Sequence, residues 1–491
     1  MDTSLPSGPH TRFLRGLERS GGGVAVHVGD QALTYERLHE LALRWGGALA
    51  ERGARTVGVL AGKGVTAYAG ILAGLYAGAT IVPLRPDFPA ARTAQMVEAA
   101  GVDVIVADER GRAVAPEGVP VLGEPRASQA LSAPLTPTSE TAYVLFTSGS
   151  TGRPKGVRIG RAALDHYFGL LDERYDFTPD DVFSQTFDLN FDCAMFDLFC
   201  AWGAGAPAVV LPGGAYRNLP RFAAERGLTV WFSTPSAIDL VRRTGGLTPG
   251  ALPGLRWSFF AGEALTVRDT ADWRAAASSS IVENLYGPTE LTVTVSGYRW
   301  DDVETPRVAV NGVVPIGSVH AGHDYVLLGS DPDEGELCIA GPQMTPGYLD
   351  PADEQGRFLE HDGQRFYRTG DRCRRLSGTD LAYLGRLDSQ VQVLGWRIEL
   401  TEVEHALRDC GIQDAVALGV AGDAGTELFV FYTGGERPVL ELVRALRAVL
   451  PEGVIPRHYR HVEEFPLNSN RKIDRKTLAA RAADLLAPAP V

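Results

Sequence analysis

The sequence has no long apolar run: nowhere in its 491 residues do about 18 apolar residues follow one another, as a transmembrane helix requires. Its N-terminus, MDTSLPSGPHTRFLRGLERS, also lacks the apolar core of a signal peptide. The sequence therefore indicates neither a membrane span nor a secretory leader, and we expect a cytoplasmic protein that does not act at a membrane.

Cysteine is scarce and scattered, with five residues and no Cys-x-x-Cys pair. Disulfide-rich secreted domains and structural zinc sites use paired cysteines at short spacing. The sequence therefore predicts reduced thiols and argues against a zinc site. The five residues are Cys193, Cys200, Cys338, Cys373 and Cys410.

Basic charge is also limited, because 47 basic residues face 60 acidic ones and the net charge is −13. This balance argues against nonspecific binding to nucleic acid or to an anionic membrane. Lysine itself occurs at only four positions, Lys63, Lys155, Lys472 and Lys476. A compact ammonium can reach an oxygen that a planar guanidinium would crowd, so the lysines in motif-like places are candidate functional residues, unless their placement is chance.

The stretch LFTSGSTGRPKGV, residues 145–157, is rich in small and hydroxyl residues. Such a run cannot build a core, but its exposed N–H and O–H donors suit an anion such as phosphate. It is not a Walker A loop, because Pro154 precedes Lys155 and Gly156 follows it. The sequence predicts a phosphate loop of another class of nucleotide enzyme, with a polar Gly/Ser linker as the alternative.

Strand-like and helix-like segments alternate over the first two-thirds of the chain. Residues 23–28, 101–108 and 206–212 read as short buried strands, and a helix is expected after Thr34 as its N-cap. This alternation is typical of layered α/β proteins, and the length suggests two to four lobes. Towards the C-terminus, Thr401 and Glu404 predict a capping box, Gly411 predicts the end of that helix, and the final hundred residues predict a small α+β domain.

Six motifs in a fixed order carry a resemblance that covers residues 33–478. They are TSGSTGRPKG (147–156), NLYGPTE (284–290), GELCIAGPQMTPGYL (335–349), YRTGD (367–371), GRLDSQVQVLGWRIEL (385–400) and PLNSNRKIDR (466–475). Taken together, they resemble the adenylate-forming superfamily: amino-acid adenylation enzymes of nonribosomal peptide synthesis, acyl-CoA synthetases and luciferases.

The resemblance implies a two-part α/β fold. Its larger part is an N-terminal core, residues 1–386, with layered α/β subdomains and a small β-barrel-like part. A hinge at 387–391, centred on Asp388, connects it to a small mobile α+β lid at 392–491. In relatives, the lid rotates between two poses, one for each half-reaction.

The resemblance also implies ATP and Mg²⁺, and assigns them residues. The phosphate loop would hold the β- and γ-phosphates, NLYGPTE would contact adenine, and a carboxylate and an arginine would bind ribose. Thr289 would donate to the α-phosphate, and Glu290 would be the Mg²⁺ ligand. The nucleotide-binding residues are Thr147, Ser148, Gly149, Ser150, Thr151, Gly152, Lys155, Asn284, Tyr286, Gly287, Asp371 and Arg386. Read locally, NLYGPTE is only a turn before a strand, and Asp371 only a turn aspartate.

Lys472 matches the lysine that bridges the substrate carboxylate and the α-phosphate in the first pose. Read locally, it belongs to a solvated basic loop. In the second pose the strand around Gly395 faces the site instead. Two departures from the family pattern occur here, Arg471 where Gly is usual and Gln392 where Lys is frequent.

TFDLNFDCAMFDLF, residues 186–199, separates the subclasses, because Asp192 matches the aspartate that binds a substrate ammonium. A buried carboxylate needs such a cationic partner. The alternative is that Asp192 caps a helix. Large rings at several of the matched pocket positions favour a small, alanine-like amino acid of open stereochemistry. These positions are Cys193, Phe196, Phe232, Phe259, Ala261, Leu285, Val293 and Thr294.

The sequence as a whole therefore predicts an amino acid:carrier-protein ligase of natural-product biosynthesis. Only thirteen residues follow Leu478, so we expect a freestanding enzyme that loads a separate carrier protein through its phosphopantetheine arm. A pattern similar to FDCAMFDLF also occurs in D-alanine–carrier-protein ligases. The alternatives are an acyl- or aryl-CoA synthetase that uses coenzyme A and a non-catalytic nucleotide-binding regulator.

Overall fold

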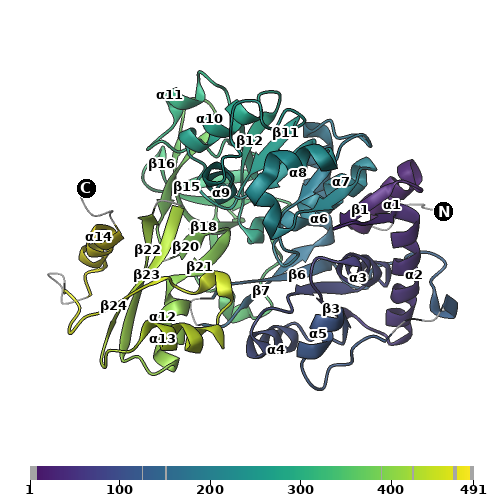
Figure 1. The fold of residues 1–491 in the computed structure, drawn as a ribbon, viewed down its shortest axis with the longest axis horizontal. Helices are drawn as coiled ribbons and strands as arrows, with labels where there is room; N and C mark the ends of the chain where they lie inside the picture. The colour runs from purple at the N-terminus through teal and green to yellow at the C-terminus, as the bar shows by residue number, and fades with distance from the viewer. Residues whose placement is uncertain are drawn as a thin grey trace.

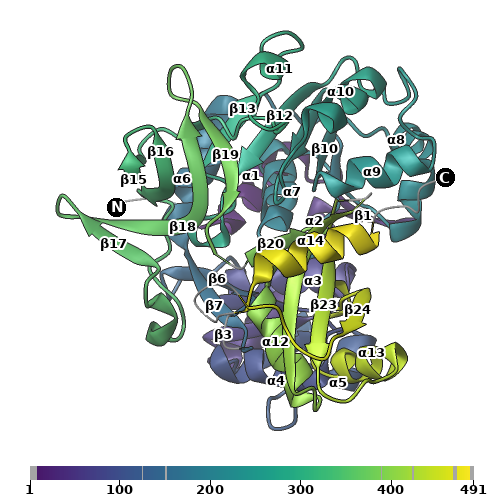
Figure 2. The ribbon, with the colours of Figure 1, turned by 90° about the vertical axis from the view of Figure 1, so that its left-hand side faces the viewer.

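The computed structural model describes residues 8–123, 125, 127–149, 152–388, 390–422, 425–467 and 473–486. Within them the chain forms a large core and a smaller C-terminal unit that packs against one side of the core (Figures 1 and 2). Among these described residues, no helix combines the length and apolarity needed to cross a bilayer.

The largest sheet has nine strands in the order β14-β13-β12-β11-β10-β8-β9-β1-β2. The strands from β12 to β1 in this order run parallel to their neighbours, whereas the outer strands are antiparallel. Parallel neighbours need crossover connections, which explains the alternation of strand and helix patterns in the sequence. The strands are β1 (Val24–Val28), β2 (Gln31–Thr34), β8 (Phe183–Gln185), β9 (Ala208–Val210), β10 (Val230–Ser233), β11 (Trp257–Phe260), β12 (Ile281–Tyr286), β13 (Ser296–Arg299) and β14 (Ser318–Val319).

A second sheet has five strands in the order β5-β3-β4-β6-β7, of which only β6 and β7 pair antiparallel. The strands are β3 (Thr56–Leu60), β4 (Thr80–Leu84), β5 (Val104–Ala107), β6 (Thr141–Thr147) and β7 (Lys155–Gly160). The strands expected at 23–28, 101–108 and 206–212 are thus confirmed as β1, β5 and β9.

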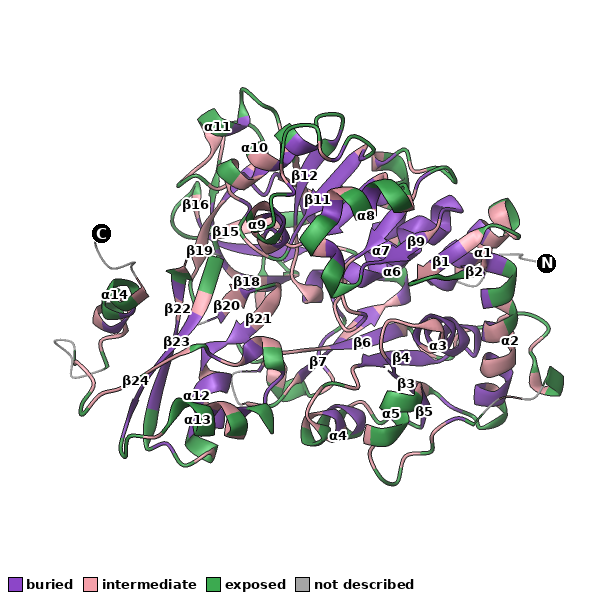
Figure 3. Cartoon of the chain, in the orientation of Figure 1, coloured by how far each residue is buried: buried purple, intermediate pink, exposed green. Residues whose placement is uncertain are grey.

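One hydrophobic cluster joins the two sheets, and two of its helices are buried almost completely. These are α3 and α7, apolar all round as buried helices are, and Figure 3 shows them buried beside the sheets. Thr34 caps α2 as expected, accepting from the N–H of Arg37. The core helices are α1 (His10–Ser20), α2 (Tyr35–Glu51), α3 (Val65–Tyr76), α4 (Ala90–Ala99), α5 (Glu109–Val114), α6 (Arg161–Arg174), α7 (Cys193–Ala204), α8 (Leu219–Arg226), α9 (Ser236–Arg243), α10 (Val267–Ala276) and α11 (Thr305–Val308), with short 3₁₀ turns η1 (Ala127–Gln129), η2 (Gly213–Asn218), η3 (Thr289–Leu291) and η4 (Pro351–Glu354).

A third, antiparallel sheet of five strands supplies the β-rich part of the core, with β19 pairing with β18. Its hydrophobic residues pack with the η3 region, so the sheet lies beside the carboxyl ends of the nine-stranded sheet. The strands are β15 (Asp324–Asp331), β16 (Glu334–Ala340), β17 (Phe358–His361), β18 (Gln364–Arg375) and β19 (Leu381–Arg386).

The C-terminal unit, hereafter the lid, contains a hairpin and a three-stranded sheet with helices on both faces. Helices α12 and α13 pack on one face of β22-β23-β24, and α14 packs on the other (Figure 2). The expected α/β class with a small α+β C-terminal unit is confirmed, whereas the boundaries at 386 and 392 stay predictions. The elements are β20 (Gln390–Val393), β21 (Trp396–Glu399), α12 (Leu400–Asp409), β22 (Asp414–Gly422), β23 (Gly425–Thr433), α13 (Val439–Arg447), η5 (Glu452–Val454), β24 (His458–His461) and α14 (Arg475–Leu486).

The predicted capping box of α12 is wrong. Strand β21 runs directly into α12, so the N-cap position falls on Glu399 and Thr401 lies inside the first turn. The Thr401 hydroxyl is buried without a hydrogen-bond partner among the described residues. Glu404 instead accepts from the N–H of Ala417 at 2.9 Å. The end of the helix is as expected, since Gly411 follows it with φ +88°.

Candidate active site

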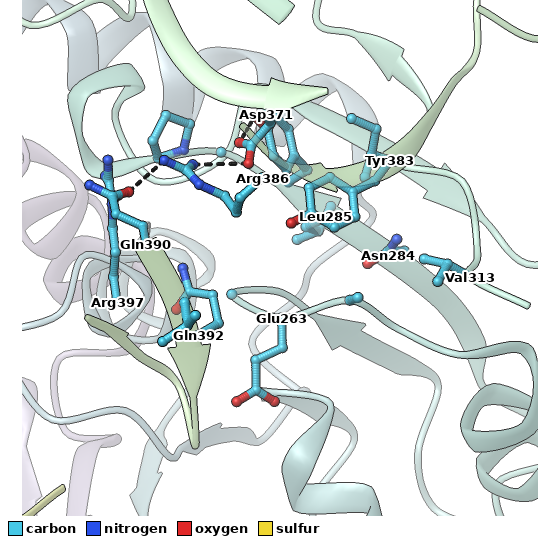
Figure 4. A pocket seen from close by; sticks show the side chains of 17 residues that line it. Glu263, Asn284, Leu285, Val313, Asp371, Tyr383, Arg386, Gln390, Gln392 and Arg397 are labelled. Atoms are coloured by element: carbon cyan, nitrogen blue, oxygen red, sulfur yellow. Dashed lines mark hydrogen bonds and ion pairs between the residues drawn. The ribbon is translucent and has the colours of Figure 1, made fainter. Parts of the chain in front are cut away.

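Two cavities meet where the carboxyl ends of β10, β11 and β12 face the lid hairpin β20–β21. Ligands of open α/β sheets bind at this edge of the strands. The first, called the Asp371 cavity, has a volume of about 100 Å³ (Figure 4). The second, called the Asp192 cavity, has a volume of about 270 Å³. Gly262, Gly287, Pro288, Gln392 and Arg397 line both, so the two cavities form one connected site.

A carboxylate, a phenol and a guanidinium meet in the Asp371 cavity. The Tyr286 hydroxyl donates to Asp371 Oδ2 at 2.6 Å, and Arg386 Nη1 donates to Asp371 Oδ1 at 2.9 Å. Burial raises the pKa of Asp371, although the Arg386 guanidinium and the Tyr286 hydroxyl oppose that shift. Three residues from distant motifs of the sequence are thus brought together as predicted.

Asn284 presents one particular group to the Asp371 cavity. Its side-chain nitrogen donates to the carbonyls of Val314, at 3.3 Å, and Pro315, at 2.9 Å. Because both amide hydrogens are engaged, the amide oxygen is left to accept from a donor in the cavity. An exocyclic amino group such as that of adenine is such a donor.

Asp192 lies at the N-cap position of α7 and lines the Asp192 cavity. Its side chain makes no capping hydrogen bond, so helix capping does not account for it. Burial raises its pKa to about 6, against the Thr289 hydroxyl and Cys193, which favour the ionised form. A bound cation would remove this penalty, because it favours the charged form of the carboxylate.

Three of the predicted pocket rings pack beneath the cavities rather than along their walls. Phe196, Phe232 and Phe259 are buried, and the Phe196 ring lies 4.8 Å from that of Phe232 and 5.3 Å from that of Phe259 between centroids. Neither cavity is lined by these rings. They pack against one another as one aromatic layer.

The other predicted pocket residues divide between the cavities and the core. Cys193 and Ala261 line the Asp192 cavity, and Leu285 lines the Asp371 cavity. Val293 and Thr294 are buried and line neither, and the Thr294 hydroxyl pairs with that of Tyr167 at 3.0 Å.

The predicted phosphate loop connects two antiparallel strands, in which Thr147 at the end of β6 pairs with Lys155 at the start of β7. Thr147 and Ser148 line the Asp192 cavity. The N–H of Gly152 donates to the carbonyl of Gly149 at 3.0 Å, and Lys155 forms a 3.5 Å ion pair with Asp353. Ser150 and Thr151 lie outside the described residues.

Strand β21 of the lid contacts the predicted phosphate and metal residues directly. The Ser148 hydroxyl donates to the Arg397 carbonyl at 2.8 Å and accepts from the N–H of Glu399 at 3.2 Å. Arg397 Nη1 donates to Glu290 Oε2 at 2.9 Å, and the Tyr348 hydroxyl donates to Glu290 Oε1 at 2.7 Å. The hairpin β20–β21, which contains Gly395 in its turn, thus faces the site, as the resemblance implies for the second pose.

The carboxylate of Glu290 suits a divalent cation. Burial opposes its ionisation, but the Arg397 guanidinium and the Tyr348 hydroxyl outweigh burial and lower its pKa to about 2. It is therefore ionised at neutral pH and already accepts one cationic group. A hard carboxylate oxygen of this kind fits Mg²⁺.

The predicted hinge is tied to the Asp371 cavity through one arginine. Arg386, which bonds Asp371, also donates from Nε to Asp388 Oδ1 at 2.9 Å, and the N–H of Gln390 donates to the same oxygen at 3.1 Å. Lys472 and Arg471 lie outside the described residues. Their described neighbours Leu467 and Ile473 line neither cavity.

Three site residues escaped the sequence analysis although the quoted motifs contain two of them. Arg397 and Tyr348 lie in GRLDSQVQVLGWRIEL and GELCIAGPQMTPGYL, but their shared partner Glu290 is distant in sequence. Glu263 lies in no motif that we recognised. Gln392, noted as a departure, lines both cavities, and its buried Oε1 has no hydrogen-bond partner among the described residues.

Comparisons with known proteins give one family and similar structures along the whole chain. The AMP-binding enzyme family matches residues 13–349. The isonitrile lipopeptide synthase of Streptomyces coeruleorubidus is 34% identical over 95% of this chain, which spans only 33% of that protein. The crystal structure of IdnL7 is 56% identical, with a TM-score of 0.77, and covers 98% of this chain and 100% of that one. The Vibrio cholerae adenylation domain AlmE, solved with glycyl-adenosine-5'-phosphate, is 26% identical, with a TM-score of 0.84 and 99% of each chain covered.

Proposed function

The chain belongs to the AMP-binding enzyme family, and on that premise we propose that it is an amino acid:carrier-protein ligase. In the first half-reaction, the carboxylate of a small, alanine-like amino acid attacks the α-phosphorus of ATP, which gives aminoacyl-AMP and releases pyrophosphate. In the second, the phosphopantetheine thiol of a separate carrier protein attacks the acyl carbon and AMP leaves. The observation that carries the proposal is the carboxylate of Asp192 in its cavity.

Asp192 supports an amino acid as the substrate because no cationic side chain among the described residues pairs with it. A buried carboxylate is stabilised by a cation that also donates hydrogen bonds, and the ammonium of an amino acid supplies both. A fatty or aryl acid would leave Asp192 unpaired. The layer formed by Phe196, Phe232 and Phe259 supports a small side chain, and the similar AlmE was solved with a glycyl adenylate.

We assign the nucleotide to the Asp371 cavity and the phosphate loop. Asp371, held by Tyr286 and Arg386, would accept from the ribose hydroxyls, and the amide oxygen of Asn284 would accept from adenine. Glu290 would hold Mg²⁺, which when bound neutralises charge on the phosphate oxygens. Thr289 bonds Asp192 and precedes Glu290 in the chain, and it would donate to the α-phosphate between the amino acid and the nucleotide.

The contacts of β21 support a change of pose between the two half-reactions. Arg397 and the backbone of Glu399 engage Glu290 and Ser148, the groups that we assign to Mg²⁺ and phosphate. They could not do so while pyrophosphate and the metal are held there. We therefore propose that the lid rotates about Asp388 after pyrophosphate leaves, and that Lys472 serves only the first pose.

The test is ATP–pyrophosphate exchange with L-, D- and β-amino acids, each beside the matching carboxylic acid that lacks the amine. We expect the best exchange with a small amino acid and none with its deaminated counterpart. Exchange that is as fast without the amine would favour an acyl- or aryl-CoA synthetase. No exchange with any acid would favour a nucleotide-binding regulator. Loading assays with holo-carrier protein and with coenzyme A then identify the acceptor.

A further inference from the structure

Glu263 is a half-buried carboxylate that the proposed chemistry does not use. It follows β11 and accepts two backbone hydrogen bonds. The N–H of Ser236, at the start of α9, donates to Oε2 at 2.9 Å, and the N–H of Gly395, in the lid hairpin, donates to Oε1 at 2.7 Å. Figure 4 shows its carboxylate directed away from Asp371 and Arg386, so it is not part of the Asp371 contacts.

The lid side of this contact is a tight turn whose glycine packs closely against Thr234. Leu394 and Gly395 both have positive φ, +50° and +83°, as the central residues of a two-residue hairpin turn do. A Cβ at Gly395 would lie 2.8 Å from Thr234 Cγ2, closer than van der Waals contact allows. The turn is therefore seated against the segment 234–236 with its N–H aimed at Glu263.

Glu263 lies next to the hairpin turn and also lines two of the hollows around the site. Glu263 lines both the Asp371 cavity and an outer cleft of about 780 Å³ between the core and the lid. On the other side of the turn, Thr234 and Gly395 line the Asp192 cavity. The hydrogen bond to Gly395 therefore holds the part of the lid that separates the outer cleft from the substrate cavity.

We infer that Glu263 is a positioning residue for the transfer half-reaction: it anchors the hairpin turn to the core in the second pose. The inference rests on the proposed two-step function. The bond to Ser236 lies within the core and persists, whereas the bond to Gly395 exists only while the hairpin faces the site. Glu263 thus stabilises the transfer pose without taking part in adenylation.

The test compares Glu263→Ala and Glu263→Gln in the two half-reactions separately. Hydrogen bonds to a charged group contribute about 1.5–3 kcal/mol, which corresponds to roughly 10- to 100-fold in a rate governed by this pose. We expect single-turnover transfer from enzyme-bound aminoacyl-AMP to fall by about that factor in Glu263→Ala. Pyrophosphate exchange, which we assign to the first pose, should fall by much less than transfer does. Glu263→Gln retains one acceptor oxygen and should be intermediate, whereas Glu225→Gln, on an exposed α8 carboxylate, is the control and should change neither.

A second readout reports the pose without any acceptor. The Cβ of Thr234 lies 3.9 Å from the ideal Cβ position of Gly395, within the range of a disulfide, and replacing Thr234 also removes the clashing Cγ2. In the Thr234→Cys/Gly395→Cys variant, adding Glu263→Ala should slow oxidative cross-linking of the two thiols by at least about tenfold. Unchanged cross-linking and transfer would overturn the inference, as would equal losses in exchange and transfer. Cross-linking that slows in an enzyme unable to load a carrier would support the inference and reject the proposed acceptor.

Discussion

The polar contacts around the site fall into two groups that differ in where their partners lie. Asp371, Tyr286, Arg386 and Asn284 are held by partners in or next to the core, and these contacts do not depend on the lid facing the site. The others cross from core to lid, at Ser148, Glu290, Glu263 and Arg92. The side that we propose for the nucleotide is therefore prearranged. The side that we propose for phosphate and the acceptor is completed by contacts that the proposed rotation would make or break.

One of the contacts between core and lid is an ion pair that is almost completely buried. Arg92 of α4 and Glu402 of α12 form a 2.6 Å ion pair whose side chains are 11% and 2% exposed. Leaving the pose would expose both charges to water, which solvates them, whereas keeping the pose requires them to stay paired. The pair can therefore form in one pose and separate in the other. In the pose described here, removing either partner would leave the other charge buried and unpaired.

The largest effect should come from making the crossing contacts permanent. In Thr234→Cys/Gly395→Cys, oxidation would fix the hairpin against the core. If adenylation needs the other pose, pyrophosphate exchange should fall to background and return when a reductant is added. Each single variant, treated with the same oxidant, is the control for the native cysteines. Full exchange by the cross-linked enzyme would show that adenylation proceeds in the pose described here, and would remove the distinction between the two groups of contacts.

Asp192 tests the prearranged core side. Asp192→Asn should lose about 2–5 kcal/mol of amino-acid binding or transition-state stabilisation, because a charge-assisted hydrogen bond to the ammonium is lost. The KM for the amino acid should rise and the KM for ATP should not, as measured by pyrophosphate exchange. Equal changes in both values would show that Asp192 supports the whole site.

The pKa of Asp192 gives that variant a pH signature. Because burial raises this pKa to about 6, the empty enzyme holds a neutral carboxyl below that pH and must ionise it to pair with an ammonium. The KM for the amino acid should therefore rise as the pH falls through about 6 in the wild type. The Asp192→Asn variant has no such group and should show a flatter profile over the same range.

Replacing Arg92 removes one of the contacts between core and lid, and its expected effect is smaller. Arg92→Met would leave Glu402 buried and unpaired only in the pose described here, so the lid would spend less time in that pose. We expect single-turnover transfer to slow by roughly tenfold, because the lid can escape the penalty by rotating, while pyrophosphate exchange stays unchanged. Arg37→Met, which removes one partner of an exposed pair with Glu40, is the matched control. Slower exchange in Arg92→Met would mean that the pair stabilises α4 rather than the pose.

The sequence could predict the core side of the site better than the crossing side. Tyr286 and Asp371 are 85 positions apart, yet both lie in motifs whose resemblance assigned them to one ligand, and the structure brings them together. Glu263 has backbone N–H groups as partners, which leave no trace in the identity of any residue. Glu290 and Arg397 depend on how the lid rests on the core, and no local pattern contains that orientation.

Two further features could not be predicted from the sequence: how the pocket phenylalanines pack, and at which residue α12 begins. The resemblance placed Phe196, Phe232 and Phe259 at pocket positions, but it did not show that their rings pack against one another. The T-x-x-E pattern at Thr401 failed by two positions, because β21 passes into α12 without a connecting residue. Both features depend on tertiary packing, which overrides a local signal that is correct on average.

The smallest expected effect concerns Thr401. Replacing it should lower stability if Thr401 caps α12, and should not lower it if Thr401 lies inside the helix. If Thr401 were the N-cap, replacing it would cost about 0.5–2 kcal/mol of stability. In the structure its hydroxyl is buried without a partner among the described residues, so Thr401→Val would exchange an unsatisfied polar group for a methyl of the same shape. Thermal unfolding of the lid should therefore occur at the wild-type temperature or slightly above it. Thr266→Val is the positive control, because the Thr266 hydroxyl does cap α10 by accepting from the N–H of Asp269 at 3.0 Å, and its loss should lower the midpoint of the core. A Thr401→Val midpoint that falls as far as that of Thr266→Val would restore the capping box and move the start of α12.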